Sequence, residues 1–261
     1  MKAKMFDKSG KEKGTVDLPK NFNIKIRADV LAKVFETQRG VYTQAYGAME
    51  GAGAQYSASG ISKKKRHDWK ATYGKGISRV PRKVMSRHGA SFNWIGATVS
   101  NTRGGRRPHA PRSAKNTFLK VNKKELLLAF NSALAGTVDA KSLENKYGKK
   151  VESGFIFSDD ILKAKTKEFI STMKTLFGEM FSTVLKHKTI RAGIGKMRGR
   201  KYKSNAGLLF VVASDEEMKR KGIEVIGVSE LTVKDLSPNG EPGRLVCYTE
   251  KAIKEIGEKF N

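Results

Sequence analysis

A long stretch without a single leucine is the feature that most constrains how this chain can fold. No leucine occurs between Leu31 and Leu119, although leucines are frequent in the later part of the chain. Glycines, alanines and serines fill much of the gap, a composition that buries little surface and leaves the backbone flexible. We therefore expect this stretch to lack a hydrophobic core of its own and to be mostly disordered in the absence of a partner.

The net charge of the chain is concentrated in two segments. The chain has 261 residues, with 52 Lys and Arg against 25 Asp and Glu, which gives a formal charge of +27. Residues 61–115 contain fifteen basic residues and one acid, Asp68, and residues 186–203 contain eight basic residues and no acid. The other 188 residues share a net charge of only +5. Because such self-repulsion destabilises a compact chain unless a polyanion neutralises it, nucleic acid is the expected partner.

Aromatic residues lie among these cations, as expected for a surface that binds unpaired nucleotides. Lys and Arg neutralise phosphates, and aromatic rings provide platforms on which bases stack. A short run of cations is usually only a solvated surface, but twenty-three basic residues against one acid exceed what solvation explains. No motif that reads base sequence accompanies the charge, so we expect recognition of shape and backbone. The candidate platforms are Trp69, Tyr73, Phe92, Trp94 and Tyr202.

The rest of the chain is typical of an α/β protein. Residues 122–130 begin a predicted helix in which Asn122 and Glu125 have capping-box spacing, and Leu126 and Phe130 share one face with two alanines. Apolar residues recur every three or four positions over residues 165–185, which predicts a second helix that packs in a core.

Short apolar runs in the C-terminal third predict strands. Residues 207–213 read as a buried parallel strand, and Ser214–Glu217 after it resemble a helix start. Further strands are expected at residues 224–228, 231–233 and 244–248, the last leading into a helix that Thr249 caps. Alternating strands and helices predict an α/β fold with a layered, parallel-type sheet, interrupted by a long extended basic loop. An amphipathic segment around Leu31 should pack against this body, so we assign residues 1–45 and 116–261 to the body and residues 46–115 to the loop.

The sequence contains no recognisable catalytic or cofactor motif. Residues 193–197 lack the hydroxyl residue of a phosphate-binding loop, and Arg198 replaces the third glycine of a dinucleotide fingerprint. The four histidines lack the spacing of metal ligands, and the single cysteine, Cys247, can form neither an internal disulfide nor a zinc site. Asp159 and Asp160 are more typical of a helix N-terminus than of paired catalytic carboxylates. We expect no enzymatic activity, no cofactor and no metal.

Hydropathy argues against a membrane protein. The mean hydropathy is −0.49, and no apolar run approaches the 18 or so residues that a membrane-spanning helix needs. Positive charge at the N-terminus is not followed by an apolar stretch, so we expect no secretory signal and a protein that stays inside the cell.

Five short strings spread over the chain resemble one known family. Residues 104–112 read GGRRPHAPR, residues 122–125 NKKE, residues 131–135 NSALA, residues 196–202 KMRGRKY and residues 242–245 PGRL. In this order they are similar to the large-subunit ribosomal protein four family, universal L-four, in its archaeal and eukaryotic form. Because the eukaryotic branch carries a long C-terminal extension and this sequence stops at Asn261, an archaeal source is expected.

The resemblance implies a structural role in the large ribosomal subunit. In that family an α/β domain lies on the outer face of the subunit and binds its rRNA, and an extended loop reaches the polypeptide exit tunnel. By analogy residues 75–87 form the loop tip, residues 104–112 the return limb and residues 196–202 the basic segment of the body. Residues 71–76 read ATYGKG where the family has a Gly-Thr-Gly-Arg-Gly-like string.

The implied partners are large-subunit rRNA, neighbouring ribosomal proteins and the nascent polypeptide near the loop tip, in a cytoplasmic ribosome and with no membrane. The alternatives are an enzyme that acts on nucleic acid and a free nucleic-acid chaperone. The predicted RNA-binding residues are Lys63, Lys64, Lys65, Arg66, Lys75, Arg79, Arg82, Lys83, Arg87, Arg103, Arg106, Arg107, His109, Arg112, Lys196, Arg198, Arg200, Lys201 and Tyr202.

Overall fold

The structure is a computed structural model that describes residues 1–149, 154–185, 188–203, 206–218, 220 and 222–259. The chain forms two compact units. One comprises Met1–Tyr42 and Phe118–Asn261 and is called the body below. The other comprises Thr43–Thr117 and is called the insert.

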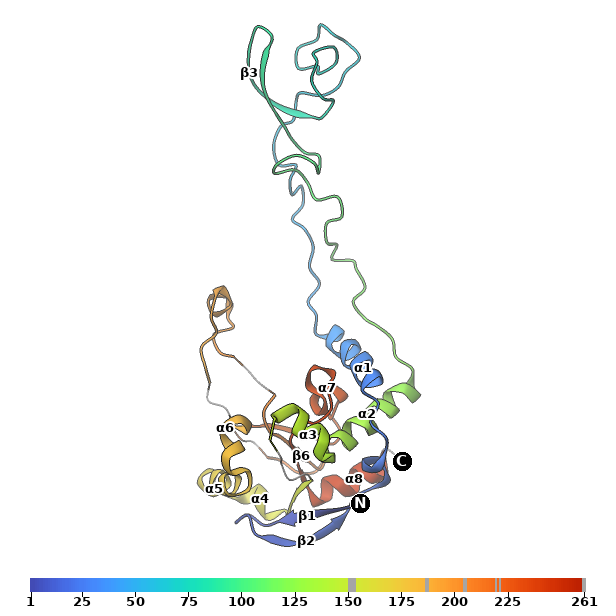
Figure 1. The fold of residues 1–261 in the computed structure, drawn as a ribbon, viewed down its shortest axis with the longest axis vertical. Helices are drawn as coiled ribbons and strands as arrows, with labels where there is room; N and C mark the ends of the chain where they lie inside the picture. The colour runs from blue at the N-terminus through green and yellow to red at the C-terminus, as the bar shows by residue number, and fades with distance from the viewer. Residues whose placement is uncertain (150–153, 186–187, 204–205, 219, 221, 260–261) are drawn as a thin grey trace. The chain divides into compact units, whose positions relative to one another are not determined.

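A six-stranded sheet with the order β2-β1-β5-β8-β6-β7 forms the centre of the body (Figure 1). The strands β1 and β2 are antiparallel, whereas every other neighbouring pair is parallel. This confirms the predicted α/β class with a mostly parallel sheet. The strands are β1 (Lys2–Phe6), β2 (Glu12–Asp17), β5 (Phe155–Phe157), β6 (Leu209–Val212), β7 (Glu224–Gly227) and β8 (Val246–Thr249).

Helices cover both faces of this sheet. Every residue of β5, β6 and β8 is buried, as expected for central parallel strands. Because side chains alternate between the two faces of a strand, Leu209 and Val211 enter one apolar cluster while Phe210 and Val212 enter the other. The helices are α1 (Ala28–Val41), α2 (Lys123–Val138), α3 (Ala140–Tyr147), α4 (Asp160–Lys163), α5 (Thr166–Phe177), α6 (Phe181–Val184), α7 (Val233–Leu236) and α8 (Glu250–Lys259), with 3-10 turns η1 (Lys20–Asn23), η2 (Gly178–Met180), η3 (Ile194–Arg198) and η4 (Pro238–Gly240).

The amphipathic segment before the leucine-free stretch packs in the body as predicted. It forms α1, whose Leu31 and Val34 are fully buried in the same cluster as Phe130 and Leu134 of α2. Helix α1, at the end of the first part of the body, and helix α2, near the start of its second part, are thus held together by apolar contacts. Both ends of the insert therefore connect to one folded unit.

The N-terminal turn of α2 differs from the prediction. Asn122 is the N-cap residue, but its side chain makes no capping hydrogen bond. Glu125 instead pairs with Lys33 of α1 at 3.0 Å, and this lysine lowers the pKa of the Glu125 carboxyl. Leu126 is 41% exposed, because only the later part of α2, from Ala129 onward, is covered by the body. The Glu125 carboxylate also accepts a hydrogen bond from the Asn122 backbone, so this half of the predicted capping box forms and the half that needs the Asn122 side chain does not.

The predicted helix over residues 165–185 is interrupted. It divides into α5, η2 and α6, and the break occurs at Gly178, whose φ of +44° is left-handed. The apolar positions keep their predicted role, because Phe169, Met173 and Phe177 are all buried in the second cluster.

Two predictions in the C-terminal third are wrong. Ser214–Glu217 do not start a helix, because the Glu216 carboxylate turns back to accept hydrogen bonds from the Ala213 amide and the Thr249 hydroxyl at 3.1 and 2.7 Å. Residues 231–233 form no strand, because Thr232 and Asp235 make a reciprocal capping box that starts α7. The helix after β8 is confirmed, and the Thr249 hydroxyl accepts from the Ala252 amide at 3.3 Å.

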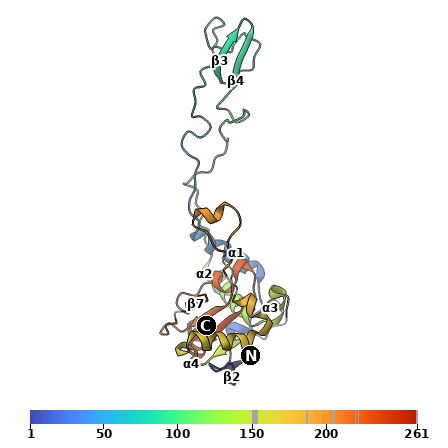
Figure 2. The ribbon, with the colours of Figure 1, turned by 90° about the vertical axis from the view of Figure 1, so that its left-hand side faces the viewer.

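The insert contains more structure than the leucine-free sequence indicates. Strands β3 (Arg82–His88) and β4 (Ser91–Gly96) form an antiparallel hairpin (Figure 2). Trp94 of β4 is 8% exposed and packs edge-on against Trp69 and Phe92, with ring centroids 6.0 and 5.1 Å apart. These rings form a small aromatic contact in the insert, whereas both apolar clusters of the described residues consist of body residues.

Candidate nucleic-acid interface

The predicted RNA-binding residues lie at the surface of their units. Sixteen of the nineteen are exposed, and only Lys75, Arg82 and Lys83 are half-buried. Fourteen of these residues, up to Arg112, belong to the insert, and the other five belong to the body, namely Lys196, Arg198, Arg200, Lys201 and Tyr202. Two further residues of the basic segment, Lys186 and His187, lie outside the described residues.

In the part of the chain that the structure describes, the charged groups of these residues have no carboxylate partners. Within the described ranges, no candidate Lys or Arg forms an ion pair. On the rest of the body, several cations are paired with carboxylates, and Arg27 holds the pKa of Asp29 at about 2. Three such pairs are Lys4–Glu12, Lys33–Glu125 and Lys254–Glu250, at 2.5, 3.0 and 2.7 Å. Charge in the candidate segments is thus left for an external anion.

Backbone carbonyls and aromatic rings orient the half-buried cations of the insert. The Lys75 ammonium donates to the carbonyl of Ala71 at 2.5 Å and lies 5.9 Å from the centroid of the Trp94 ring. The Lys83 ammonium lies 3.7 Å from the centroid of Tyr56. Cation–π contacts of this kind fix a charge without neutralising it. These contacts hold the two ammonium groups at defined positions in the insert.

The end of β3, next to the hairpin turn, carries a further oriented cation. Arg87 stacks over Phe92, with 5.0 Å between the guanidinium carbon and the ring centroid, and its Nε donates to the carbonyl of Gly89 at 2.9 Å. Both contacts leave the outer nitrogens of the guanidinium available, and His88 beside it is exposed.

The structure revises the set of aromatic platforms. Trp94 cannot stack on a base in this conformation, because its ring is the centre of the small aromatic core. Trp69, Tyr73 and Tyr202 are 55%, 43% and 48% exposed, so each presents ring surface to solvent. Sequence reasoning overlooked Tyr46, which is 71% exposed. The available signal was an isolated aromatic residue among small residues in the leucine-free stretch.

In the body, the basic segment 188–203 is a loop closed by paired backbone. The Arg191 amide donates to the Lys201 carbonyl at 2.8 Å, and the Lys203 amide donates to Thr189 at 2.9 Å. The turn η3 lies between these two limbs. The ammonium groups of Lys188 and Lys201 each lie 5.6 Å from the Tyr202 centroid. Three exposed cations lie in or directly after η3, namely Lys196, Arg198 and Arg200.

Side chains suited to catalysis are not assembled in the described ranges. Among those residues, no three His, Cys, Asp or Glu side chains are grouped as metal ligands. Burial raises the pKa of the Cys247 thiol, which keeps it protonated and unreactive. The helices in the described part of the chain are all too short or too polar to cross a bilayer.

Comparison with known proteins agrees with this arrangement of charge and fold. The sequence pattern of the Ribosomal protein L4/L1 family matches residues 16–259. The chain belongs to this family. The resemblance inferred from the five short strings is therefore confirmed.

Similar proteins come from several archaea. A protein named large ribosomal subunit protein uL4 from Nanoarchaeum equitans is 34% identical over 267 residues, which cover 99% of this chain and 98% of that protein. The protein of that name from Methanococcus aeolicus is 35% identical over 273 residues and the full length of both chains. The one from Halobacterium salinarum is 31% identical over 269 residues, with 99% and 100% covered.

Proposed function

We propose that this protein is a structural, non-catalytic component of the large ribosomal subunit that binds large-subunit rRNA. The observation that carries the proposal is the dense group of exposed cations in the insert and in residues 188–203, which contain almost no acid and whose cations have no carboxylate partner within the described ranges. Membership of the Ribosomal protein L4/L1 family and the names of the similar archaeal proteins support the same role.

Phosphate neutralisation accounts for the binding energy in this proposal. Each Lys or Arg that contacts a phosphate releases condensed counterions, so affinity falls steeply as salt rises. With about ten phosphate contacts, affinity should fall by roughly 10³- to 10⁵-fold between 50 and 200 mM salt. The nineteen predicted residues are the proposed contacts, with the exposed rings of Trp69 and Tyr73 as additional stacking surfaces.

The hairpin of the insert is the proposed contact with the exit tunnel and the nascent polypeptide. Residues 75–87, the tip expected from the family resemblance, include most of β3. Strand β3 exposes Met85, Arg87 and His88. A surface of mixed apolar and cationic side chains can contact a passing chain without specific recognition of its sequence.

The direct test is the salt dependence of rRNA binding after loss of two arginines. Arg106 and Arg107 are exposed and lack carboxylate partners in the described structure, so Arg106→Ala with Arg107→Ala should reduce the slope of log K against log salt by about 1.5. An unchanged slope would show that these arginines do not face RNA.

Cross-linking the protein to RNA in cells and mapping the attached nucleotides tests the assignment independently. Adducts should fall in large-subunit rRNA, and the protein should sediment with large subunits in a sucrose gradient. Sedimentation only as free protein would favour a nucleic-acid chaperone, and magnesium-dependent turnover of RNA would favour an enzyme.

A further inference from the structure

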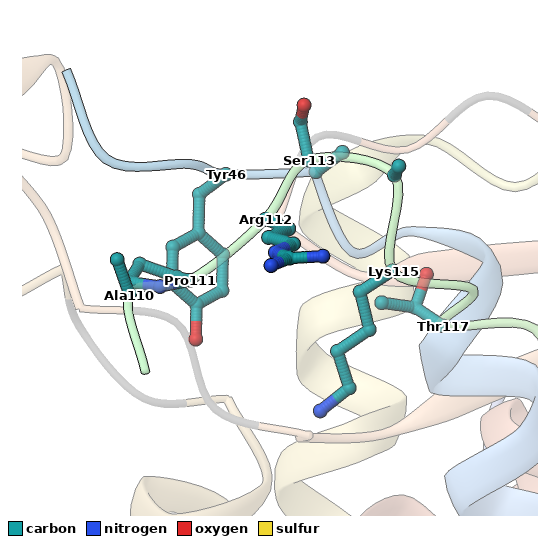
Figure 3. A pocket seen from close by; sticks show the side chains of 9 residues that line it. Tyr46, Ala110, Pro111, Arg112, Ser113, Lys115 and Thr117 are labelled. Atoms are coloured by element: carbon teal, nitrogen blue, oxygen red, sulfur yellow. The ribbon is translucent and has the colours of Figure 1, made fainter. Parts of the chain in front are cut away.

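The insert contains a pocket of about 490 Å³ where its first and last segments meet (Figure 3). Tyr46 comes from the first segment, and Pro111, Arg112 and Lys115 come from the last. The volume lies within the range of about 300–1,000 Å³ that is usual for sites of small ligands. None of the predicted tip residues takes part, so this site is separate from the hairpin.

Backbone contacts hold the two segments together around this pocket. The Ala48 amide donates to the Pro111 carbonyl at 3.1 Å. Gly47 lies against Ser113, and a Cβ at Gly47 would come within 3.3 Å of the Ser113 nitrogen. The pocket is therefore defined by direct contact between the two segments, and a small residue at position 47 favours this close approach.

A turn places two cations at the same pocket. The Lys115 amide donates to the Arg112 carbonyl at 3.1 Å, which closes a turn over Arg112–Lys115. In Figure 3 the side chains of Arg112 and Lys115 lie on one side of this turn, and that of Ser113 points to the other side. Both cations are exposed and have no carboxylate partner within the described ranges.

The pocket thus combines an aromatic ring, an apolar wall and two unpaired cations. The Tyr46 ring is 71% exposed, and Pro111 and alanines supply the wall beside it. A nucleotide has a flat base that stacks on a ring and a phosphate that binds Lys or Arg, so it satisfies all three features. An acidic peptide would satisfy the cations but would leave the ring unused.

We infer that this pocket binds one unpaired nucleotide of the rRNA, with the base stacked on Tyr46 and the phosphate between Arg112 and Lys115. The inference rests on the proposed function, because it names a particular subsite within the same RNA complex. The apolar wall excludes water from one side of the base, and the two cations set the position of the backbone.

Equilibrium binding of the full chain to large-subunit rRNA at several salt concentrations tests the subsite. Tyr46→Ala should weaken binding by about five- to a hundredfold at every salt concentration, because a stacking contact is lost while no charge changes. Tyr46→Phe should bind like the unmodified chain. Arg112→Gln should reduce the salt slope by about one.

The matched control is Tyr42→Ala. Tyr42 is 73% exposed but belongs to the body, where the Lys234 ammonium lies 4.0 Å from its ring centroid. This variant should retain full affinity. Equal affinities for the unmodified chain and Tyr46→Ala, or equal losses for Tyr42→Ala and Tyr46→Ala, would overturn the inference.

Ultraviolet cross-linking identifies the contacted nucleotide directly. We expect one adduct on the peptide that contains Tyr46, joined to a nucleotide that is unpaired in the rRNA, and loss of this adduct in Tyr46→Ala. An adduct in a base-paired helix would contradict the inference even where rRNA binding itself is normal. If the unmodified chain shows no salt-dependent rRNA binding, the proposed function fails and the subsite fails with it.

Discussion

Three unpaired cations at the end of the basic loop of the body provide a quantitative test of how this protein binds RNA. The perturbation is the triple variant Lys196→Gln, Arg198→Gln and Arg200→Gln. All three side chains are exposed and have no carboxylate partner within the described ranges, so their removal deletes positive charge without breaking an ion pair.

The expected magnitude follows from counting phosphate contacts. Each contact contributes about 0.7–0.9 to the slope of log K against log salt, so loss of three contacts should reduce that slope by about 2–3. Between 50 and 200 mM salt, the variant should therefore lose about 20- to 40-fold less affinity than the unmodified chain. At low salt it should bind more weakly, because the electrostatic contribution is largest there.

The structure offers a control with the same change in net charge. Lys4→Gln, Lys33→Gln and Lys254→Gln also remove three positive charges, but these lysines already pair with Glu12, Glu125 and Glu250. Exposed ion pairs contribute about 0–1 kcal/mol each, so the control variant should remain folded.

Filter binding of the unmodified chain and both variants to large-subunit rRNA, from 50 to 400 mM potassium chloride, measures the slopes. We expect a reduced slope only in the triple variant of residues 196–200. Equal reductions in the two variants would mean that net charge alone governs binding, which would refute the argument from unpaired cations.

Three further outcomes concern the stability of the body. Gly243→Ala should lower the free energy of unfolding by about 2–5 kcal/mol, because the φ of Gly243 is +97° and a Cβ there would lie 2.5 Å from the Ser142 carbonyl oxygen. An unchanged midpoint of urea unfolding would contradict this close approach. Arg244→Met should lower the free energy of unfolding by about 2–5 kcal/mol, because the buried guanidinium donates to the carbonyls of Gly207 and Asp235 at 3.0 and 2.5 Å and pairs with Glu224. Circular dichroism during thermal unfolding would detect this loss of stability. Burial raises the pKa values of Cys247 and Tyr248, so these groups lose their protons at lower pH in the unfolded chain than in the folded one. The free energy of unfolding should therefore fall above about pH 8.5, by up to about 1.4 kcal/mol per pH unit for each titrating group. Cys247→Ala should make this decline shallower between pH 8.5 and 10, whereas identical pH profiles of the variant and the unmodified chain would exclude a role for the thiol.

Composition and local pattern were sufficient to predict much of this protein. The two basic segments, the α/β class and the buried strands at β6 and β8 can all be inferred from neighbouring residues. Charge density is a property of composition, and a continuous apolar run such as residues 207–213 indicates burial whatever it packs against. The family resemblance came from short strings whose order is also a property of the sequence.

Long-range contacts decided what local pattern could not. Glu125 has the spacing of a capping residue but pairs with Lys33, which lies 92 positions earlier in the chain. The strands β1, β2 and β5 carry no strong local signal, and they were not predicted because their place depends on partners in the sheet.

The difference between local composition and long-range contacts also explains which parts of the candidate interface the sequence could identify. Sequence alone determined where the cations are concentrated, because charge does not depend on folding. Only the tertiary structure decided that Trp94 is a core residue, that Tyr46 faces a pocket with Arg112, and which lysines of the body already have carboxylate partners. Exposure and ion pairing arise from contacts between residues far apart in sequence, so the composition of a segment cannot specify them.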